Sequence, residues 1–157
     1  DNMKVFDGPG EYELLGILIR GVMTPPGVES PTTSKNTAYH IEMEGIRLGH
    51  LGDIAGNLSV RQIEELTPLD VLFVPVGEHC TVSLPQALEI THALNPKLVI
   101  PMHFGQPGLQ TELNGVESFL KGMEVTEAVP QSRLSVTAST IPQETRVVLL
   151  EAQGLPS

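Results

Sequence analysis

Two short apolar runs, separated by a helix-like segment, most constrain what this chain can fold into. Residues 71–76 and 98–102 are almost entirely apolar, as strands are when both of their faces are covered. Ser83 and Gln86 between them have the spacing of a capping box, which begins a helix, and an Asn-Pro pair at 95–96 ends it. Strand, helix and strand at this spacing predict a βαβ unit with two parallel strands.

The rest of the chain predicts short elements around this unit. Alternating residues on both sides of Glu44-Gly45 indicate a β-hairpin. A capping box at Ser59 begins a short helix that ends before Pro68, and apolar spacing predicts another helix at 115–122. We also expect strands at 3–7, 11–20, 37–43, 46–51, 133–136 and 146–151, a long Pro-rich loop at 24–36, and frayed residues at 154–157.

Composition limits the class of protein. The chain has 157 residues, which suits a single domain spanning 1–157. Its net charge of −10 opposes binding to nucleic acid and to anionic membranes. The single cysteine excludes an internal disulfide and fits a reducing compartment. We therefore expect a soluble, cytoplasmic α/β domain.

Polar clusters follow three of the expected strands. They are HLGD at 50–53, GEHCT at 77–81 and PMHFG at 101–105. Ligands of α/β sheets gather beyond the carboxyl ends of the strands, and carboxylate and imidazole are usual ligands of a hydrolytic zinc. A carboxylate and an imidazole on such turns can converge on one point, which makes Asp53 and His103 candidates for metal binding and catalysis, with His79 as the third candidate ligand.

Four strings give a family resemblance that covers nearly the whole chain: GEYELLG, NTAYHIEMEGIRLGHLGD, LDVLFVPVG and NPKLVIPMHF. In this order they resemble the later part of the metallo-β-lactamase superfamily. They are most similar to the branch with L-ascorbate-6-phosphate lactonase and many zinc-dependent hydrolases. The resemblance implies a four-layer αββα sandwich, here N-terminally incomplete. It also implies that Asp53 is the bridging metal ligand and His103 the late histidine ligand.

The departures from the family pattern concern the remaining ligands. The H-x-H-x-D-H motif of the family is absent, because the family places it before the segment that begins here. The family's middle histidine is expected just after Thr24, where this chain has Pro25-Pro26-Gly27. Proline cannot bind a metal, and a catalytic zinc normally keeps three protein ligands. The resemblance therefore implies zinc in an intact site, whereas this chain alone is also compatible with no metal.

These observations leave two hypotheses. In the first, the chain is the C-terminal portion of a zinc-dependent hydrolase of a small ester, lactone or phosphate-bearing substrate, and is inactive alone. In the second, it is a degenerate, non-catalytic family member with a binding or structural role. In either case the sheet face or edge that the N-terminal half would cover is exposed, which predicts a homo-oligomer or pairing with the missing segment.

Each candidate residue also has a structural interpretation. Asp53 could cap the turn that follows it through the amides of Ile54 and Ala55. His103 could be a strand-end histidine that is bonded to backbone. We expect structural roles for four other polar residues, which are His40, His50, Asp70 and His92. We expect no nucleophile at Cys80. Glu78 could make a local contact or line the pocket near Asp53 and His103.

Overall fold

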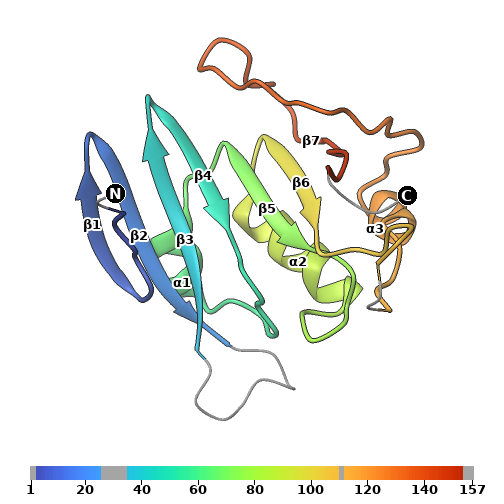
Figure 1. Cartoon of the computed structure of the whole chain (residues 1–157), viewed down its shortest axis with the longest axis horizontal. Helices are drawn as coiled ribbons and strands as arrows, with labels where there is room; N and C mark the ends of the chain where they lie inside the picture. Colours follow the sequence, from blue (N-terminus) through green and yellow to red (C-terminus); the bar gives the residue numbers. More distant parts are fainter. Residues whose placement is uncertain (1–2, 26–34, 110–111, 154–157) are drawn as a thin grey trace.

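The computed structural model describes residues 3–25, 35–109 and 112–153. Its centre is one seven-stranded sheet whose strands lie side by side in chain order (Figure 1). The strands and helices follow the chain as β1 (Gly10–Leu14), β2 (Ile17–Thr24), β3 (Asn36–Met43), β4 (Ile46–His50), α1 (Val60–Leu66), β5 (Val71–Pro75), α2 (Leu84–Leu94), β6 (Leu98–Met102), α3 (Glu117–Gly122) and β7 (Arg146–Val147).

The sheet has an antiparallel half and a parallel half. Strands β1 to β4 form an antiparallel meander, and the expected hairpin turns at Glu44 and Gly45, both at positive φ. From β4 to β7 each strand is parallel to its neighbour. The βαβ unit predicted from the two apolar runs is confirmed as β5, α2 and β6.

Helices α1 and α2 cover one face of the sheet, behind the strands in Figure 1. The core between them is aliphatic: Leu72 and Val99 of the sheet and Ala87 of α2 are fully buried. Both predicted capping boxes are present. At α1 the N–H of Ser59 donates to Oε1 of Gln62 at 2.7 Å, which fixes the direction in which the helix leaves its loop.

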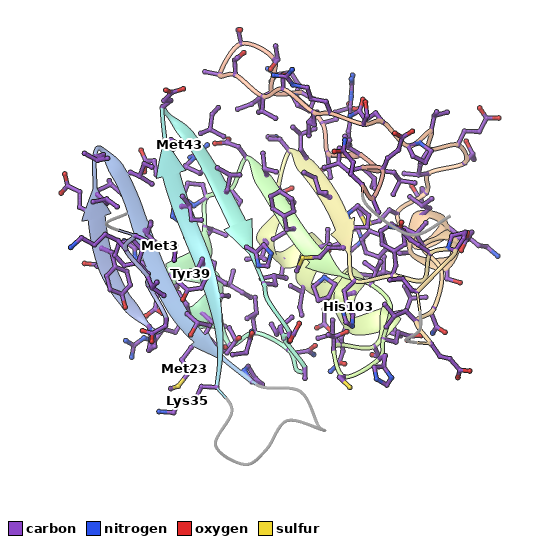
Figure 2. The ribbon with its side chains drawn as sticks, viewed as in Figure 1. Met3, Met23, Lys35, Tyr39, Met43 and His103 are labelled. Atoms are coloured by element: carbon purple, nitrogen blue, oxygen red, sulfur yellow. The ribbon has the colours of Figure 1, made fainter. Side chains whose placement is uncertain are left out.

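The sheet face opposite to α1 and α2 is only partly covered by other segments of the protein. At one side the hydroxyl of Tyr39 donates to the carbonyl of Phe6 at 2.9 Å, so residues 3–9 cross the face there. At the other side the segment with Leu134, Val136 and Ile141 packs on an apolar cluster of β4, β5 and β6. Between them Met43 keeps 43% of its surface exposed (Figure 2).

The incompletely covered face bears on the expected partners. The expectation that a second copy or a preceding segment covers it stays a prediction. Sizing chromatography of the chain at micromolar concentration checks it, because a strictly monomeric chain would count against pairing.

Two of the expected strands are wrong. Residues 3–7 and 133–136 are not strands. Leu134 and Val136 pack on the sheet face without joining a strand, whereas Met3 and Val5 are 83% and 72% exposed. An alternating pattern indicates two unlike sides of a segment but does not show whether its backbone is paired.

Other boundaries differ by a few residues. The run 11–20 is divided by a turn at Leu15-Gly16, the last helix begins at Glu117, and the strand expected at 146–151 is only Arg146–Val147. Residues 154–157 and most of the loop 24–36 lie outside the described residues. In the described part of the chain, no helix is long and apolar enough to cross a membrane.

Candidate metal centre

The three predicted ligands lie at one edge of the sheet. Strands β4, β5 and β6 are parallel. β5 and β6 end in register, with Pro75 paired to Met102, and β4 ends two residues earlier, with His50 paired to Phe73. Asp53, His79 and His103 follow these three strand ends, and all three residues are exposed. Since adjacent strands are about 4.8 Å apart, the tips of β4 and β6 are separated by roughly 10 Å.

Asp53 sits on a short turn between two fully buried residues, Leu51 and Ile54. Gly52 has φ +60°, and a Cβ there would come within 2.5 Å of Oδ1 of Asn36. The N–H of Asp53 donates to that same oxygen at 2.9 Å. The Ala55 N–H donates to the carbonyl of Pro25 at 3.1 Å, so the expected cap of the Ala55 amide by the Asp53 carboxylate is wrong, and the cap of the Ile54 amide stays a prediction.

His50 is part of the same turn. Its Nδ1 accepts a hydrogen bond from the N–H of Gly52 at 3.1 Å, and its ring lies 5.8 Å from that of Phe73, centroid to centroid. Burial lowers the pKa of the His50 imidazole, and the negative charge of Asp53 opposes this shift only partly. The structural role expected for His50 agrees with these contacts.

His103 comes directly after β6 at φ +52°. Its Nε2 lies 3.0 Å from the carbonyl oxygen of His79. Because a carbonyl only accepts, Nε2 carries a proton, and in the neutral ring Nδ1 then keeps the lone pair. The expected backbone contact of His103 is therefore present, and it leaves one ring nitrogen able to bind a metal. Such a contact orients metal-binding histidines in general.

Gly77 allows the tips of β5 and β6 to approach each other. A Cβ at Gly77 would overlap the carbonyl oxygen of His103 and come within 3.1 Å of Cα of Phe104. The next residue, Glu78, accepts a hydrogen bond from the N–H of Leu84 at 2.7 Å and a second one from the Asn114 side chain. Glu78 therefore makes the local contact and ties this loop to the start of α2.

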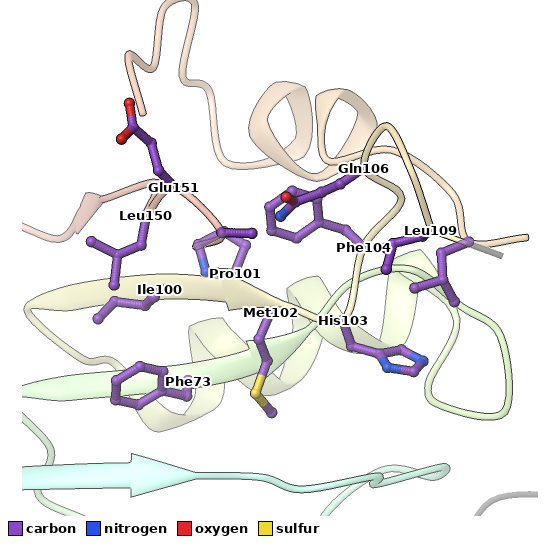
Figure 3. Close-up of a pocket in the computed structure, with 12 residues that line it drawn as sticks. Phe73, Ile100, Pro101, Met102, His103, Phe104, Gln106, Leu109, Leu150 and Glu151 are labelled. Carbon is purple, nitrogen blue, oxygen red and sulfur yellow. The ribbon is translucent and has the colours of Figure 1, made fainter. Parts of the chain in front are cut away.

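A cavity of about 540 Å³ lies beside His103. Figure 3 shows His103 next to Leu109, with Met102 and Phe73 also lining the cavity. Most of its other lining residues are apolar too. Asp53 and His79 do not line this cavity. Of the three predicted ligands, His103 alone therefore contacts it.

The described residues do not by themselves fit a catalytic zinc. Carboxylate and imidazole are suitable ligands, but residues 3–25, 35–109 and 112–153 contain no group of three or more His, Cys, Asp or Glu that could hold a metal. A catalytic zinc normally keeps three protein ligands. The ring of Pro25 packs against the loop after Asp53, since a Cβ on Gly56 would meet it at 3.2 Å. Pro25 occupies the region where the resemblance expects a histidine.

Comparison with known proteins decides the family. A model described as "Beta-lactamase superfamily domain" matches residues 1–103, about two thirds of the chain. The chain belongs to this superfamily. A protein of Thermotoga maritima assigned to the Zn-dependent hydrolases of the metallo-beta-lactamase superfamily has a similar crystal structure. The match has a TM-score of 0.82 and 35% identity, over 97% of this chain and 74% of that one. The predicted α/β fold of this superfamily is confirmed.

Curated relatives of this superfamily member carry the name UPF0173. A UPF0173 metal-dependent hydrolase of Archaeoglobus fulgidus is 34% identical over 66 residues, which are 42% of this chain and 29% of that protein. A UPF0173 protein of Pyrococcus furiosus is 34% identical over 95 residues, 60% of this chain and 42% of that protein. The chain thus spans less than half the length of these two relatives.

Sequence reasoning did not single out Asn36. Its side-chain amide donates to Oγ1 of Thr24 at 2.6 Å and to the carbonyl of Leu51 at 2.8 Å, in addition to the bond from Asp53. These partners lie 12 to 17 residues away along the chain. An asparagine at the end of a loop carries no local signal for contacts at that distance.

Proposed function

We propose that this chain is the part of a metal-dependent hydrolase that supplies two ligands, Asp53 and His103, to a zinc site at the carboxyl edge of β4 to β6. The chain alone is inactive, because two protein ligands are fewer than a catalytic zinc keeps. His79 is the third candidate ligand, and its carbonyl also orients His103.

One observation supports this proposal above the others. The carboxylate of Asp53 and the imidazole of His103 follow the ends of strands that run parallel in the same sheet, and both are exposed. Both residues lie within the segment that matches the superfamily domain. The name of the Archaeoglobus relative, a metal-dependent hydrolase, points to the same chemistry.

Zinc bound per chain tests the ligand assignment. The purified chain is titrated with Zn²⁺ alone, and Asp53→Ala and His103→Ala are each compared with the parent chain. We expect weak binding that either substitution lowers at least about ten-fold, since the loss of a ligand costs more than the loss of an outer contact.

Two exposed residues away from this edge are matched controls. His92→Ala removes an imidazole from α2, and Glu64→Ala removes a carboxylate from α1. Neither should change zinc binding. If Asp53→Ala and His103→Ala bind zinc as the parent chain does, neither residue belongs to a metal site.

The substrate we propose is a small ester, a lactone or a phosphate-bearing molecule. The resemblance to the L-ascorbate-6-phosphate lactonase branch supports the lactone, and the apolar cavity beside His103 could hold the uncharged part of such a molecule. Assays of the full-length protein with a lactone, a carboxylic ester and a phosphate ester separate these classes. No turnover of any of the three would argue against the hydrolase.

A second candidate is a non-catalytic member of the superfamily. Pro25 favours it, because a residue that cannot bind metal packs directly against the loop of Asp53. The codons upstream of Asp1 discriminate between the two functions. An H-x-H-x-D-H segment there supports the enzyme, whereas a preceding segment without it supports the binding or structural role.

A further inference from the structure

The turn that carries Asp53 is held by two side-chain acceptors. Its two central amides, those of Gly52 and Asp53, both donate to side-chain acceptors. Gly52 donates to His50, two residues earlier in the chain. Asp53 donates to Asn36, which lies 17 residues away at the start of β3.

Asn36 uses all of its side-chain polar groups at this point. Its oxygen accepts from the N–H of Asp53, and its NH₂ group donates to Thr24 and to the carbonyl of Leu51. Thr24 is 3% exposed, so one end of this contact set is anchored inside the protein. The carboxamide thereby links the end of β2, the start of β3 and the turn after β4.

The turn depends on these contacts because its own backbone does not close it. The carbonyl of Leu51 and the N–H of Asp53 bond to the same Asn36 side chain and not to each other. A Cβ at Gly52 would also collide with Oδ1 of Asn36, so Asn36 and Gly52 are matched in shape. Fixing a backbone in one conformation costs entropy, and satisfied polar contacts offset that cost.

We propose that Asn36 is a positioning residue, whose carboxamide fixes the turn at Gly52 and Asp53 and so aims the Asp53 carboxylate away from the sheet. That the carboxylate binds a metal rests on the proposed function, whereas the placement of the turn does not. Asn36 acts through Asp53 and does not itself touch a metal or a substrate.

Amide hydrogen exchange of the full chain, followed by NMR, tests the placement. In Asn36→Ala the protection of the Asp53 amide should fall about ten-fold, because its acceptor is gone. The Val82 amide, which donates to the carbonyl of Ile54 at 2.8 Å, should keep its protection, since the loss is local. Asn36→Asp keeps an acceptor in place and should restore most of the protection at Asp53.

Thr24→Val is the matched control. It removes the hydroxyl that accepts from Asn36 but leaves the contacts of Asn36 with Leu51 and Asp53 in place. The protection of the Asp53 amide should stay within about two-fold of the parent chain. An equal loss in Thr24→Val and Asn36→Ala would overturn the proposal, as would unchanged protection in a folded Asn36→Ala.

A measurement on the unaltered chain covers the case in which Asn36→Ala does not fold. The scalar coupling across the hydrogen bond between the Asp53 N–H and the side-chain carboxamide carbon of Asn36 should be detectable. Its absence, in a chain whose helices and sheet are intact by circular dichroism, would overturn the proposal.

Titration with Zn²⁺ alone separates this inference from the proposed function. If Asp53→Ala lowers zinc binding, Asn36→Ala should lower it about ten-fold, as loss of an orienting contact does at metal sites; unchanged binding in Asn36→Ala would then overturn its positioning role. If Asp53→Ala leaves zinc binding unchanged, the metal assignment fails. The exchange experiment still decides whether Asn36 holds the turn.

Discussion

The charged residues at the two ends of the parallel strands differ in burial and in hydrogen bonding. At the amino ends, Asp70 before β5 is 4% exposed and binds Arg47 of β4 through three hydrogen bonds of 2.8 to 2.9 Å. Its carbonyl accepts from the N–H groups of Lys97 and Leu98 as well. At the carboxyl ends, Asp53 and His103 are exposed.

This difference separates stability from function within one sheet. Both carboxylate oxygens of Asp70 accept hydrogen bonds from Arg47, which holds β4 beside the start of β5. The carboxylate of Asp53 lies on a turn that is fixed through backbone amides. Fixing a residue by its backbone leaves the side chain able to bind something else.

The largest expected effect is that of Asp70→Ala on folding. It removes three hydrogen bonds to Arg47. Because the Arg47 side chain is 36% exposed, water replaces part of this interaction, and we expect a cost of about 2–3 kcal/mol. Urea unfolding of both chains measures the difference. Asp53→Ala is the matched comparison and should change the free energy of unfolding by less than about 0.5 kcal/mol. Equal losses for the two substitutions would remove the contrast between the two ends.

Gly77→Ala should come next. The added Cβ would overlap the backbone of His103, and overpacking of this kind costs about 2 kcal/mol. We also expect the amide and ring signals of His103 to shift in NMR spectra. Gly8→Ala is the control, because a Cβ there meets nothing within 4 Å. Equal free energies of unfolding for Gly77→Ala and Gly8→Ala would show that the tips of β5 and β6 leave room for a side chain at Gly77.

The acid side of the stability profile should depend on Asp70. The hydrogen bond from Arg47 holds the pKa of Asp70 below its usual value. The ionised form is thus favoured by folding, and its contribution is complete above the unfolded pKa of about 3.9 and is lost as the pH falls through the folded pKa. Free energies of unfolding measured from pH 6 downward should fall less steeply in Asp70→Ala than in the parent chain. Parallel profiles would contradict this.

The smallest effect concerns His50 at the carboxyl edge. Burial lowers the pKa of its imidazole, and the charge of Asp53 raises it in part. An NMR titration should therefore give a midpoint below about 6.5, and Asp53→Asn should lower it further. Because the folded chain favours the neutral ring, this contribution to stability is present above about pH 6.5 and is lost as the pH falls. A midpoint that is unchanged in Asp53→Asn would show that the charge of Asp53 does not act on His50.

Local sequence patterns were enough for the elements with strong local signals. Ser59 with Gln62 marked α1, and the apolar run at 71–76 marked a strand that is buried on both faces. Asp53 and His103 are also predicted from sequence, as polar side chains that follow strand ends, and the structure places both residues after the ends of parallel strands. Whether Asp53 and His103 share a metal stays a prediction. Local sequence patterns do not fix the directions of the two side chains, because both residues lie on turns.

The parallel strand–helix–strand unit, the capped helices and the charged residues after strand ends follow from local sequence, because they depend on neighbours within a few positions. Three other features follow from long-range contacts alone: the unpaired segments 3–9 and 133–136, the bond of Glu78 to the start of α2, and the bond of Asn36 to the turn of Asp53. These outcomes depend on contacts between distant segments, and the same local pattern is compatible with several such contacts.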